Sequence, residues 1–391
     1  MNPSVFAEDR DICLHRFEDS GQFKGAIVPP TYSNTLFIYS SFEELADADC
    51  HKHNHYIYSR GMNPTVEIVE KKLAALERGD QCKTFSSGMA AINAAIFNSV
   101  KSGEHVLVVS NIYSTTLNLL KYLQKFNVEH STVHSTNVED IERAIRSNTT
   151  VIYFESPTDM YLRLIDLKAV ATFAKSVGIR TIIDNTWATP LFQKPLTLGI
   201  DIVVHSASKY LGGHSDVMAG AVISSASIME TIFSEEYLLH GGILVPDEAT
   251  KLLKGLRTLP LRMKVHEDNA YKVAAFLEGH EKVKSVHYPG LPSHPDFSLG
   301  QQQMSGTSGL LSFELDTTSF EMVAGVINKV KVFQIGVSWG SFESLIWSPN
   351  YGTNMDSLKK EHIHPGMIRI VVGQSDSGEL IEDLDQALTA F

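Results

Sequence analysis

Short apolar runs rich in β-branched residues alternate with longer amphipathic stretches between about residues 84 and 225. Runs without polar alternation are typical of strands that are buried on both faces. The pattern predicts strands at 105–109, 149–155, 178–184, 201–205 and 220–224. Because strands and helices alternate, the chain is expected to form an α/β fold around a parallel sheet.

Capping residues predict where two of the helices begin. Asn63 precedes Pro64, and this pair favours a helix that runs to Gly79, since Asn caps free amides and Pro suits the first helical position. Thr136 is followed three residues later by Glu139, which predicts a helix that starts with a capping box.

The pattern changes after about residue 247. A long helix is predicted at 248–277, followed by a Pro/Gly-rich passage and mixed strands and helices. The chain then ends in a helix whose apolar face consists of Leu380, Ile381, Leu384, Ala387 and Leu388.

These changes divide the chain into three predicted regions. Residues 1–60 lack clear periodicity and are interpreted as an extended N-terminal arm, 61–247 as a large domain, and 248–391 as a smaller C-terminal α+β domain.

Composition narrows the class of partner. With 33 Lys and Arg against 45 Asp and Glu, the net charge is −12, which disfavours nucleic acid and anionic membranes. No apolar stretch approaches the length of a membrane span, and the first residues do not look like a signal peptide. Three cysteines without a CxxC pair favour a reducing compartment, so a cytoplasmic location is expected.

Two strand ends carry the strongest candidate chemistry. Ser206, Ser208 and Lys209 follow directly after an apolar strand. They are therefore expected at the sheet edge where α/β proteins bind ligands. The hydroxyls suit a phosphate and the amine suits a Schiff base, although a lone lysine is more often a surface residue. Asp184 ends the preceding apolar strand and suits the ring nitrogen of pyridoxal phosphate, with a helix cap or turn as its ordinary role.

A third segment, Ser86–Ala91, places small residues before an apolar helix. Helix N-terminal amides bind phosphate, and Gly88 permits close approach.

Together these motifs resemble the Cys/Met metabolism family of pyridoxal-phosphate enzymes, which includes cystathionine synthases and lyases and methionine γ-lyase. The resemblance extends over nearly the whole chain. It rests on Tyr58–Arg60, Asn63–Thr65, Ser86–Ala91, Glu155–Thr158, Asp184–Thr186, His205–Asp216, Glu343–Leu345 and Arg369.

The resemblance implies pyridoxal-phosphate-dependent transferase fold type I and assigns roles to individual residues. Lys209 is expected to hold pyridoxal phosphate and to move protons, and Asp184 to pair with the ring nitrogen. Tyr113 is expected to stack on the ring and to protonate a leaving group, with a core aromatic as the alternative. Further cofactor contacts are expected from Ser87, Gly88, Met89, Asp159, Thr186, Ser206 and Ser208.

The resemblance also implies a shared site and a substrate pocket. Tyr58 and Arg60 are expected to reach the phosphate of a neighbouring subunit, which implies a homotetramer built as a dimer of dimers. Arg369 is expected to pair with the substrate carboxylate, with an internal salt bridge as the alternative. Val337 and Ser338 are expected beside it.

Asp159 departs from the family, which has asparagine at this position and uses it to donate a hydrogen bond to the phenolic oxygen of the cofactor. An ionised carboxylate has no proton to donate. Asp159 is therefore expected to be protonated, to accept a proton from the phenol, or to turn away.

The leading functional hypothesis is a lyase that eliminates a γ- or β-heteroatom substituent from a methionine, cystathionine or homoserine-ether type of amino acid. It would release a 2-oxo acid and ammonia. The alternatives are a γ-replacement synthase of the cystathionine γ-synthase or sulfhydrylase type, and a cofactor-binding regulatory protein without catalysis. No metal site is expected: His51, His53 and His55 lack acidic or cysteine partners.

Overall fold

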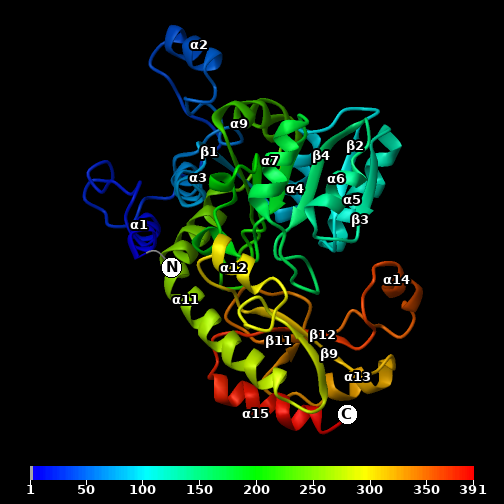
Figure 1. The fold of residues 1–391 in the computed structure, drawn as a ribbon. Helices are drawn as coiled ribbons and strands as arrows, with labels where there is room; N and C mark the ends of the chain where they lie inside the picture. Colours follow the sequence, from blue (N-terminus) through cyan, green and yellow to red (C-terminus); the bar gives the residue numbers. More distant parts are fainter. Residues whose placement is uncertain (1–2) are drawn as a thin grey trace.

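Two sheets with helices packed around them form the body of the molecule (Figure 1). The computed structural model describes residues 3–391. The larger sheet consists of β1 (Gln81–Phe85), β2 (His105–Val109), β3 (Glu129–Val133), β4 (Thr149–Glu155), β5 (Arg180–Asp184), β6 (Ile202–His205) and β7 (Gly220–Ser224). The smaller sheet consists of β8 (Val283–His287), β9 (Leu310–Leu315), β10 (Gln334–Ile335), β11 (Leu345–Trp347) and β12 (Met367–Val371).

The helices are α1 (Pro3–Leu14), α2 (Phe42–Cys50), α3 (Pro64–Glu77), α4 (Gly88–Phe97), α5 (Ser114–Leu123), α6 (Val138–Ala144), α7 (Leu167–Ser176), α8 (Thr189–Phe192), α9 (Ala226–Ile232), α10 (Leu238–His240), α11 (Pro246–Glu278), α12 (Phe297–Gln303), α13 (Phe320–Ile327), α14 (Met355–Lys360) and α15 (Ser377–Leu388). The α/β class is confirmed.

The larger sheet has the strand order β1-β7-β6-β5-β4-β2-β3. Strands β2 to β6 are mutually parallel, as predicted, whereas β7 is antiparallel to both of its neighbours. The prediction of a parallel strand at 220–224 is therefore wrong in direction. All residues of β7 are buried, so its apolar run carries no information about strand direction.

Strands β1 and β3 were not predicted from the sequence. Strand β3 lies at the sheet edge, and its residues Glu129–Val133 are mostly polar and only partly buried. An edge strand of this kind lacks the apolar run that marks the central strands.

Alternate residues of the central strands contact different helices. Val106 and Val108 lie in a core with α4, α5 and α9, while Leu107 and Val109 lie in a second core with α6 and α7. The sheet is thus covered on both faces, which explains its continuous apolar runs.

One of the two predicted caps is confirmed. The side chain of Asn63 accepts a hydrogen bond from the amide of Thr65 at the start of α3. The capping box at Thr136 is wrong: α6 begins at Val138, and its N-cap residue, Asn137, makes no side-chain cap. The hydroxyl of Ser135 instead accepts from the amide of Asn137, which shortens the helix at its start.

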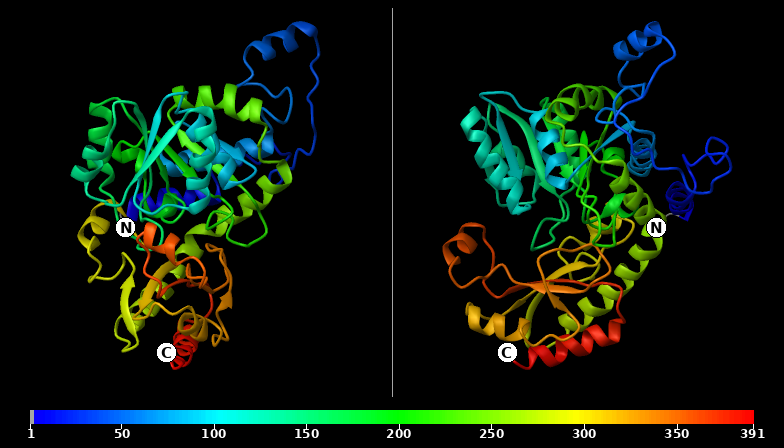
Figure 2. Two further views of the ribbon diagram at one scale, coloured as in Figure 1. Left: turned by 90° about the vertical axis from the view of Figure 1, so that its right-hand side faces the viewer. Right: turned by 180° about the vertical axis from the view of Figure 1, so that it is seen from behind.

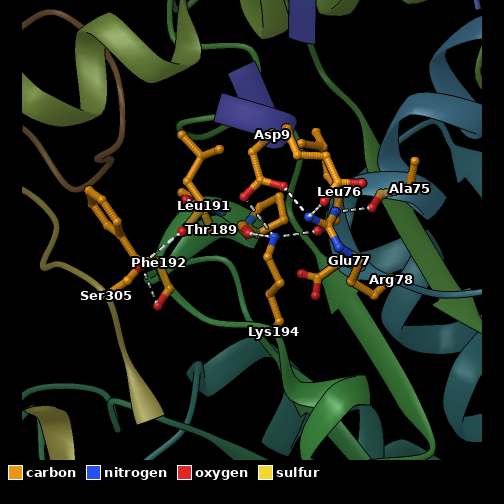
Figure 3. Close-up of polar contacts among 12 residues, drawn as sticks. Asp9, Ala75, Leu76, Glu77, Arg78, Thr189, Leu191, Phe192, Lys194 and Ser305 are labelled. Atoms are coloured by element: carbon orange, nitrogen blue, oxygen red, sulfur yellow. Dashed lines mark hydrogen bonds and ion pairs between the residues drawn. The ribbon is translucent and has the colours of Figure 1, made fainter. Parts of the chain in front are cut away.

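The first 60 residues contain two helices that their sequence pattern does not show. Helix α1 packs against α3 and α11 and buries Ile12. Asp9, also buried, lies 2.9 Å from both Lys194 Nζ and Arg78 Nη2 (Figure 3). Polar anchoring of this kind leaves no apolar periodicity in the sequence.

Residues 31–33 of the segment 26–60 are hydrogen-bonded to α3 and α11. The later part of this segment, with α2 at its tip, stands away from the body in all three views (Figures 1 and 2). The segment carries exposed apolar side chains, among them Ile27 and Ile38, each 90% exposed, and Phe42. An apolar surface this exposed is typical of a segment that contacts another protein surface.

Helix α11 runs from beside the larger sheet to the smaller sheet (Figure 2). It contacts α1 and α3 beside the larger sheet, and α15, β8 and β9 beside the smaller one, whose order is β10-β11-β12-β9-β8. The predicted apolar face of α15 packs into this second core. Within residues 3–391, no helix combines the length and apolar character that crossing a membrane requires.

Candidate active site

Six strands of the larger sheet, β1 to β6, end at the same edge. Strands β4, β5 and β6 are mutually parallel, and β1 points the same way because both β1 and β6 are antiparallel to β7. The residues that follow these strands therefore converge, which is the usual place for a ligand in an α/β sheet.

Lys209 follows β6 and points toward the smaller sheet's side of this edge. Its Nζ lies 2.9 Å from the hydroxyl of Ser338. Gly340, with a φ of 86°, lies against it: a Cβ there would come within 2.8 Å of Lys209 Cβ. Burial, and then the positive charge of Arg369, lower the pKa of Lys209. The neutral amine, which is the nucleophilic form, is thereby favoured.

Asp184 ends β5 and is held by Thr186. Its Oδ1 accepts hydrogen bonds from the amide and the hydroxyl of Thr186, and the Thr186 hydroxyl accepts from the amide of Ser206 at 2.8 Å. Burial raises the pKa of Asp184, which the bonds from Thr186 counteract. A cationic partner would stabilise the ionised form.

A buried polar network supports the end of β5 from behind. Glu77 Oε1 lies 2.6 Å from His205 Nε2 and accepts a hydrogen bond from Asn185 at 2.8 Å. Asn185 also donates to the carbonyl of Gln193. These bonds fix the turn that follows Asp184. The role of Glu77 was not predicted, because Glu77 lies far from both Asn185 and His205 in the chain.

The start of α4 lies close to Ser206. Ser87 caps the helix by accepting from the amide of Ala90, and a Cβ at Gly88 would lie only 2.8 Å from the side chain of Ser206. The predicted group of Ser87, Gly88, Met89 and Ser206 thus combines a helix N-terminus with a nearby hydroxyl. Ser208 lies on the same turn, and its hydroxyl exchanges hydrogen bonds with the backbone of Ala219.

Tyr113 stands at the start of α5 with 49% of its surface exposed, so it is not a core aromatic. Its amide donates to Glu155 Oε1 at 2.7 Å. Burial and the nearby carboxylates Asp184 and Asp159 raise the pKa of Glu155. Glu155, whose role was not predicted, positions the backbone that carries Tyr113.

Arg369 lies in the middle of β12 and is almost completely buried. Its Nη1 lies 3.2 Å from Asp159 Oδ1, and its Nη2 donates to the carbonyl of Val337 at 2.8 Å. The alternative of an internal salt bridge is therefore realised in this structure. Trp347, opposite Arg369 on β11, covers the guanidinium with its ring centre 4.6 Å from Cζ. Trp347 was not predicted, since only sheet register brings it to this site.

The structure does not bring Tyr58 and Arg60 into any of these contacts. Tyr58 is half exposed at the base of the projecting part of the 26–60 segment, and the guanidinium of Arg60 lies 5.7 Å from its ring centre. No group of three or more His, Cys, Asp and Glu side chains within residues 3–391 is arranged to hold a metal ion.

The residues present fit pyridoxal phosphate. The helix start at Gly88 approaches Ser206 so closely that only glycine fits there, Asp184 is a buried carboxylate suited to a protonated ring nitrogen, and Lys209 is a partly desolvated amine within electrostatic reach of Asp184. These are the three groups that the phosphate, the pyridine and the aldehyde of this cofactor need.

Comparison with known proteins agrees with this reading. The family model for Cys/Met metabolism PLP-dependent enzymes matches residues 11–389. The chain is 38% identical to an L-methionine gamma-lyase of Fusobacterium nucleatum over 93% of this chain and 94% of the relative. It is 41% identical to a cystathionine gamma-lyase of Bacillus subtilis over 86% of this chain and 89% of the relative. It is 36% identical to a cystathionine beta-lyase of Lactococcus lactis over 96% of this chain and 97% of the relative.

A solved structure, that of metB from Corynebacterium glutamicum, superimposes with a TM-score of 0.90 and 32% identity over 97% of each chain. The predicted fold type I is thereby confirmed, and the cofactor prediction with it. The chain belongs to the Cys/Met metabolism family of pyridoxal-phosphate-dependent enzymes.

Proposed function

We propose that this enzyme is a lyase that eliminates a γ- or β-heteroatom substituent from a methionine, cystathionine or homoserine-ether type of amino acid, releasing a 2-oxo acid and ammonia. The observation that carries the proposal is that Lys209 lies within electrostatic reach of both Asp184 and the buried Arg369, at the edge where β4, β5 and β6 end. The activities named for the relatives, γ- and β-elimination from sulfur amino acids, support the same class.

In this proposal the phosphate of the cofactor binds to Ser87, Gly88, the amide of Met89, Ser206 and Ser208, while Asp184, positioned by Thr186, binds the ring nitrogen. When bound, pyridoxal phosphate stabilises negative charge that develops at the α-carbon of the substrate.

The protein's own groups then bind the substrate and move protons. Arg369 holds the α-carboxylate, and Lys209 removes the proton from the α-carbon. Tyr113, exposed at the start of α5, donates a proton to the leaving heteroatom. Ser338 keeps the Lys209 amine aimed at the substrate through their 2.9 Å contact.

An amino-acid panel tests this function. The purified holoenzyme is incubated with methionine, cystathionine and an O-substituted homoserine, with and without an added thiol, and 2-oxo acid and ammonia are measured. Release of 2-oxobutyrate without the thiol is the expected result. New amino acids formed only with the thiol would instead identify a γ-replacement synthase, and inactivity in both arms would favour a regulatory protein.

The Lys209→Ala variant completes this test. Because the proposal routes every proton transfer at the α-carbon through Lys209, this variant should lose turnover while its circular dichroism stays unchanged. Retained turnover would exclude Lys209 as the catalytic base.

We further propose that the chain forms a homotetramer in which Tyr58 and Arg60 complete a neighbouring subunit's phosphate site. The 26–60 segment, whose later part projects from the body, and its exposed side chains Ile27 and Ile38 support this assembly. Mixing inactive Tyr58→Ala protein with inactive Lys209→Ala protein should restore part of the activity if sites are shared. Light scattering of the purified protein gives its mass directly.

We also propose that the chain divides into an N-terminal arm (1–60), a large domain (61–247) and a C-terminal domain (248–391), and that the protein is cytoplasmic. Unpaired Cys13, Cys50 and Cys82 support a reducing location. The long helix α11, which begins at Pro246, supports a boundary at its first turn.

A further inference from the structure

Arg369 already has an anionic partner within the chain. Its Nη1 contacts Asp159 Oδ1 at 3.2 Å, and its Nη2 is used by the carbonyl of Val337. Nε is buried and has no hydrogen-bond partner among residues 3–391. Nη1 and Nη2 each carry a second N–H, so the guanidinium retains donors for an incoming carboxylate.

The contact with Asp159 changes the charge that such a carboxylate meets. The Arg369 side chain is 9% exposed and that of Asp159 is 20% exposed, so water screens their attraction little. Burial lowers the pKa of Arg369, and the negative charge of Asp159 acts in the opposite direction. The guanidinium stays charged, and its charge is largely balanced before a ligand arrives.

Asp159 is held in this position by a second contact. Its Oδ1 also accepts a hydrogen bond from the amide of Met160 at 3.0 Å. The indole of Trp347 covers one face of the guanidinium, so a ligand must approach Arg369 at its edge, where Asp159 also lies. A ligand carboxylate and Asp159 would then share one positive charge and repel each other.

We propose that Asp159 is a resident counter-ion of Arg369 that weakens the binding of carboxylate ligands and so sets the substrate affinity of the enzyme. This inference rests on the proposed function, which assigns the substrate carboxylate to Arg369. The neutral asparagine that the resembled family has at this position would leave the charge of Arg369 available to the ligand.

Binding of butyrate to the holoenzyme tests the inference. Butyrate has a carboxylate but no amino group, so it reports on the Arg369 site without reacting with the cofactor. Its dissociation constant is measured by calorimetry for the wild type and for Asp159→Asn. We expect the variant to bind butyrate about tenfold more tightly, since it removes a like charge from the site.

Two controls make the result specific. Asp316→Asn removes the same charge from a surface residue with an 81% exposed side chain and should leave butyrate binding unchanged. Butyramide, which lacks the charge, should bind wild type and Asp159→Asn equally. Butyrate binding that is unchanged or weaker in Asp159→Asn, or strengthened equally in Asp316→Asn, would overturn the inference.

Kinetics provide an independent measurement. With an amino-acid substrate, Asp159→Asn should lower KM more than it changes kcat, whereas a structural defect would lower kcat and the melting temperature together. If Asp159→Asn does not fold, Asp159→Ser, which is smaller and neutral, should strengthen butyrate binding in the same way. Because butyrate binding needs no turnover, failure of the proposed lyase activity would leave this test intact.

Discussion

Lys209 Nζ and Ser338 Oγ lie 2.9 Å apart. Lys209 follows strand β6 of the larger sheet, whereas Ser338 belongs to the C-terminal region beside the smaller sheet. This contact joins the two halves of the molecule at the amine that we propose as the catalytic base. Ser338→Ala is expected to reduce kcat about tenfold. The variant loses a hydrogen bond that orients the amine, and such a bond contributes about 1–2 kcal/mol. Steady-state kinetics checks this, with Ser341→Ala in the same loop as the control; equal effects of both changes would contradict a specific role for Ser338.

The lowered pKa of Lys209 predicts a pH dependence of cofactor capture. Its amine loses its proton below the ordinary value of 10.5, so the rate at which cofactor-free protein binds added pyridoxal phosphate should reach its plateau below that pH. Arg369 contributes to the lowering, and Arg369→Gln should therefore move the plateau to higher pH. Stopped-flow absorbance measures both profiles, and an unmoved plateau in the variant would rule out this electrostatic coupling.

The close approach of Gly88 to Ser206 predicts that Gly88→Ala loses cofactor affinity. A Cβ at this position would meet Ser206 at 2.8 Å and push apart the helix N-terminus and the hydroxyl. We expect at least about a tenfold rise in the dissociation constant of pyridoxal phosphate, equivalent to about 1.4 kcal/mol. Gly242→Ala is a matched control because its nearest neighbour would lie at an ordinary 3.4 Å, and it should bind the cofactor normally.

Trp347 predicts a change in KM. Its ring covers the guanidinium of Arg369 at 4.6 Å, and a cation–π contact of this kind contributes roughly 0.5–2 kcal/mol. Trp347→Leu is expected to raise KM about three- to tenfold, with a smaller effect on kcat, since Arg369 becomes less fixed. Trp347→Phe keeps an aromatic face, so its KM should lie between those of the wild type and Trp347→Leu. A fall in kcat without a change in KM would contradict this role of Trp347.

The buried Asp9 predicts a large change in stability far from the active site. Asp9→Asn removes the anion beside Lys194 and Arg78 and is expected to lower the free energy of unfolding by about 3–5 kcal/mol. Asp11→Asn, on the same helix, breaks only an exposed pair with Arg16 and should cost less than about 1 kcal/mol. Urea unfolding followed by circular dichroism compares them, and similar midpoints for the two variants would refute the anchoring role.

Much of the larger sheet and of its catalytic edge could be predicted because the relevant information is local. The run before Lys209 and the run that ends in Asp184 are buried strands. Asp184 is the last residue of β5, and Lys209 lies in the turn that follows β6, as expected. A strand end and a helix cap are both encoded within a few neighbouring residues.

The contacts that were not predicted join residues that are distant in sequence. Trp347 reaches Arg369 only through the pairing of β11 with β12, and Asp159 reaches it from the end of β4. The direction of β7 was also not encoded in its apolar pattern. Tertiary register and charge pairing therefore decide the substrate side of the site, whereas local pattern decides the cofactor side.

The placement of β7 between β1 and β6 has a consequence for synthesis on the ribosome. Strand β1 pairs only with β7, through contacts such as Phe85 with Gly220, so it has no strand partner until the chain beyond Lys209 has emerged. Helix α1 likewise packs on α11, which is made later still. The nascent chain must therefore hold its first strand without its strand partner while residues 86–219 are made, and the unpaired strand edge is open to wrong association in that interval.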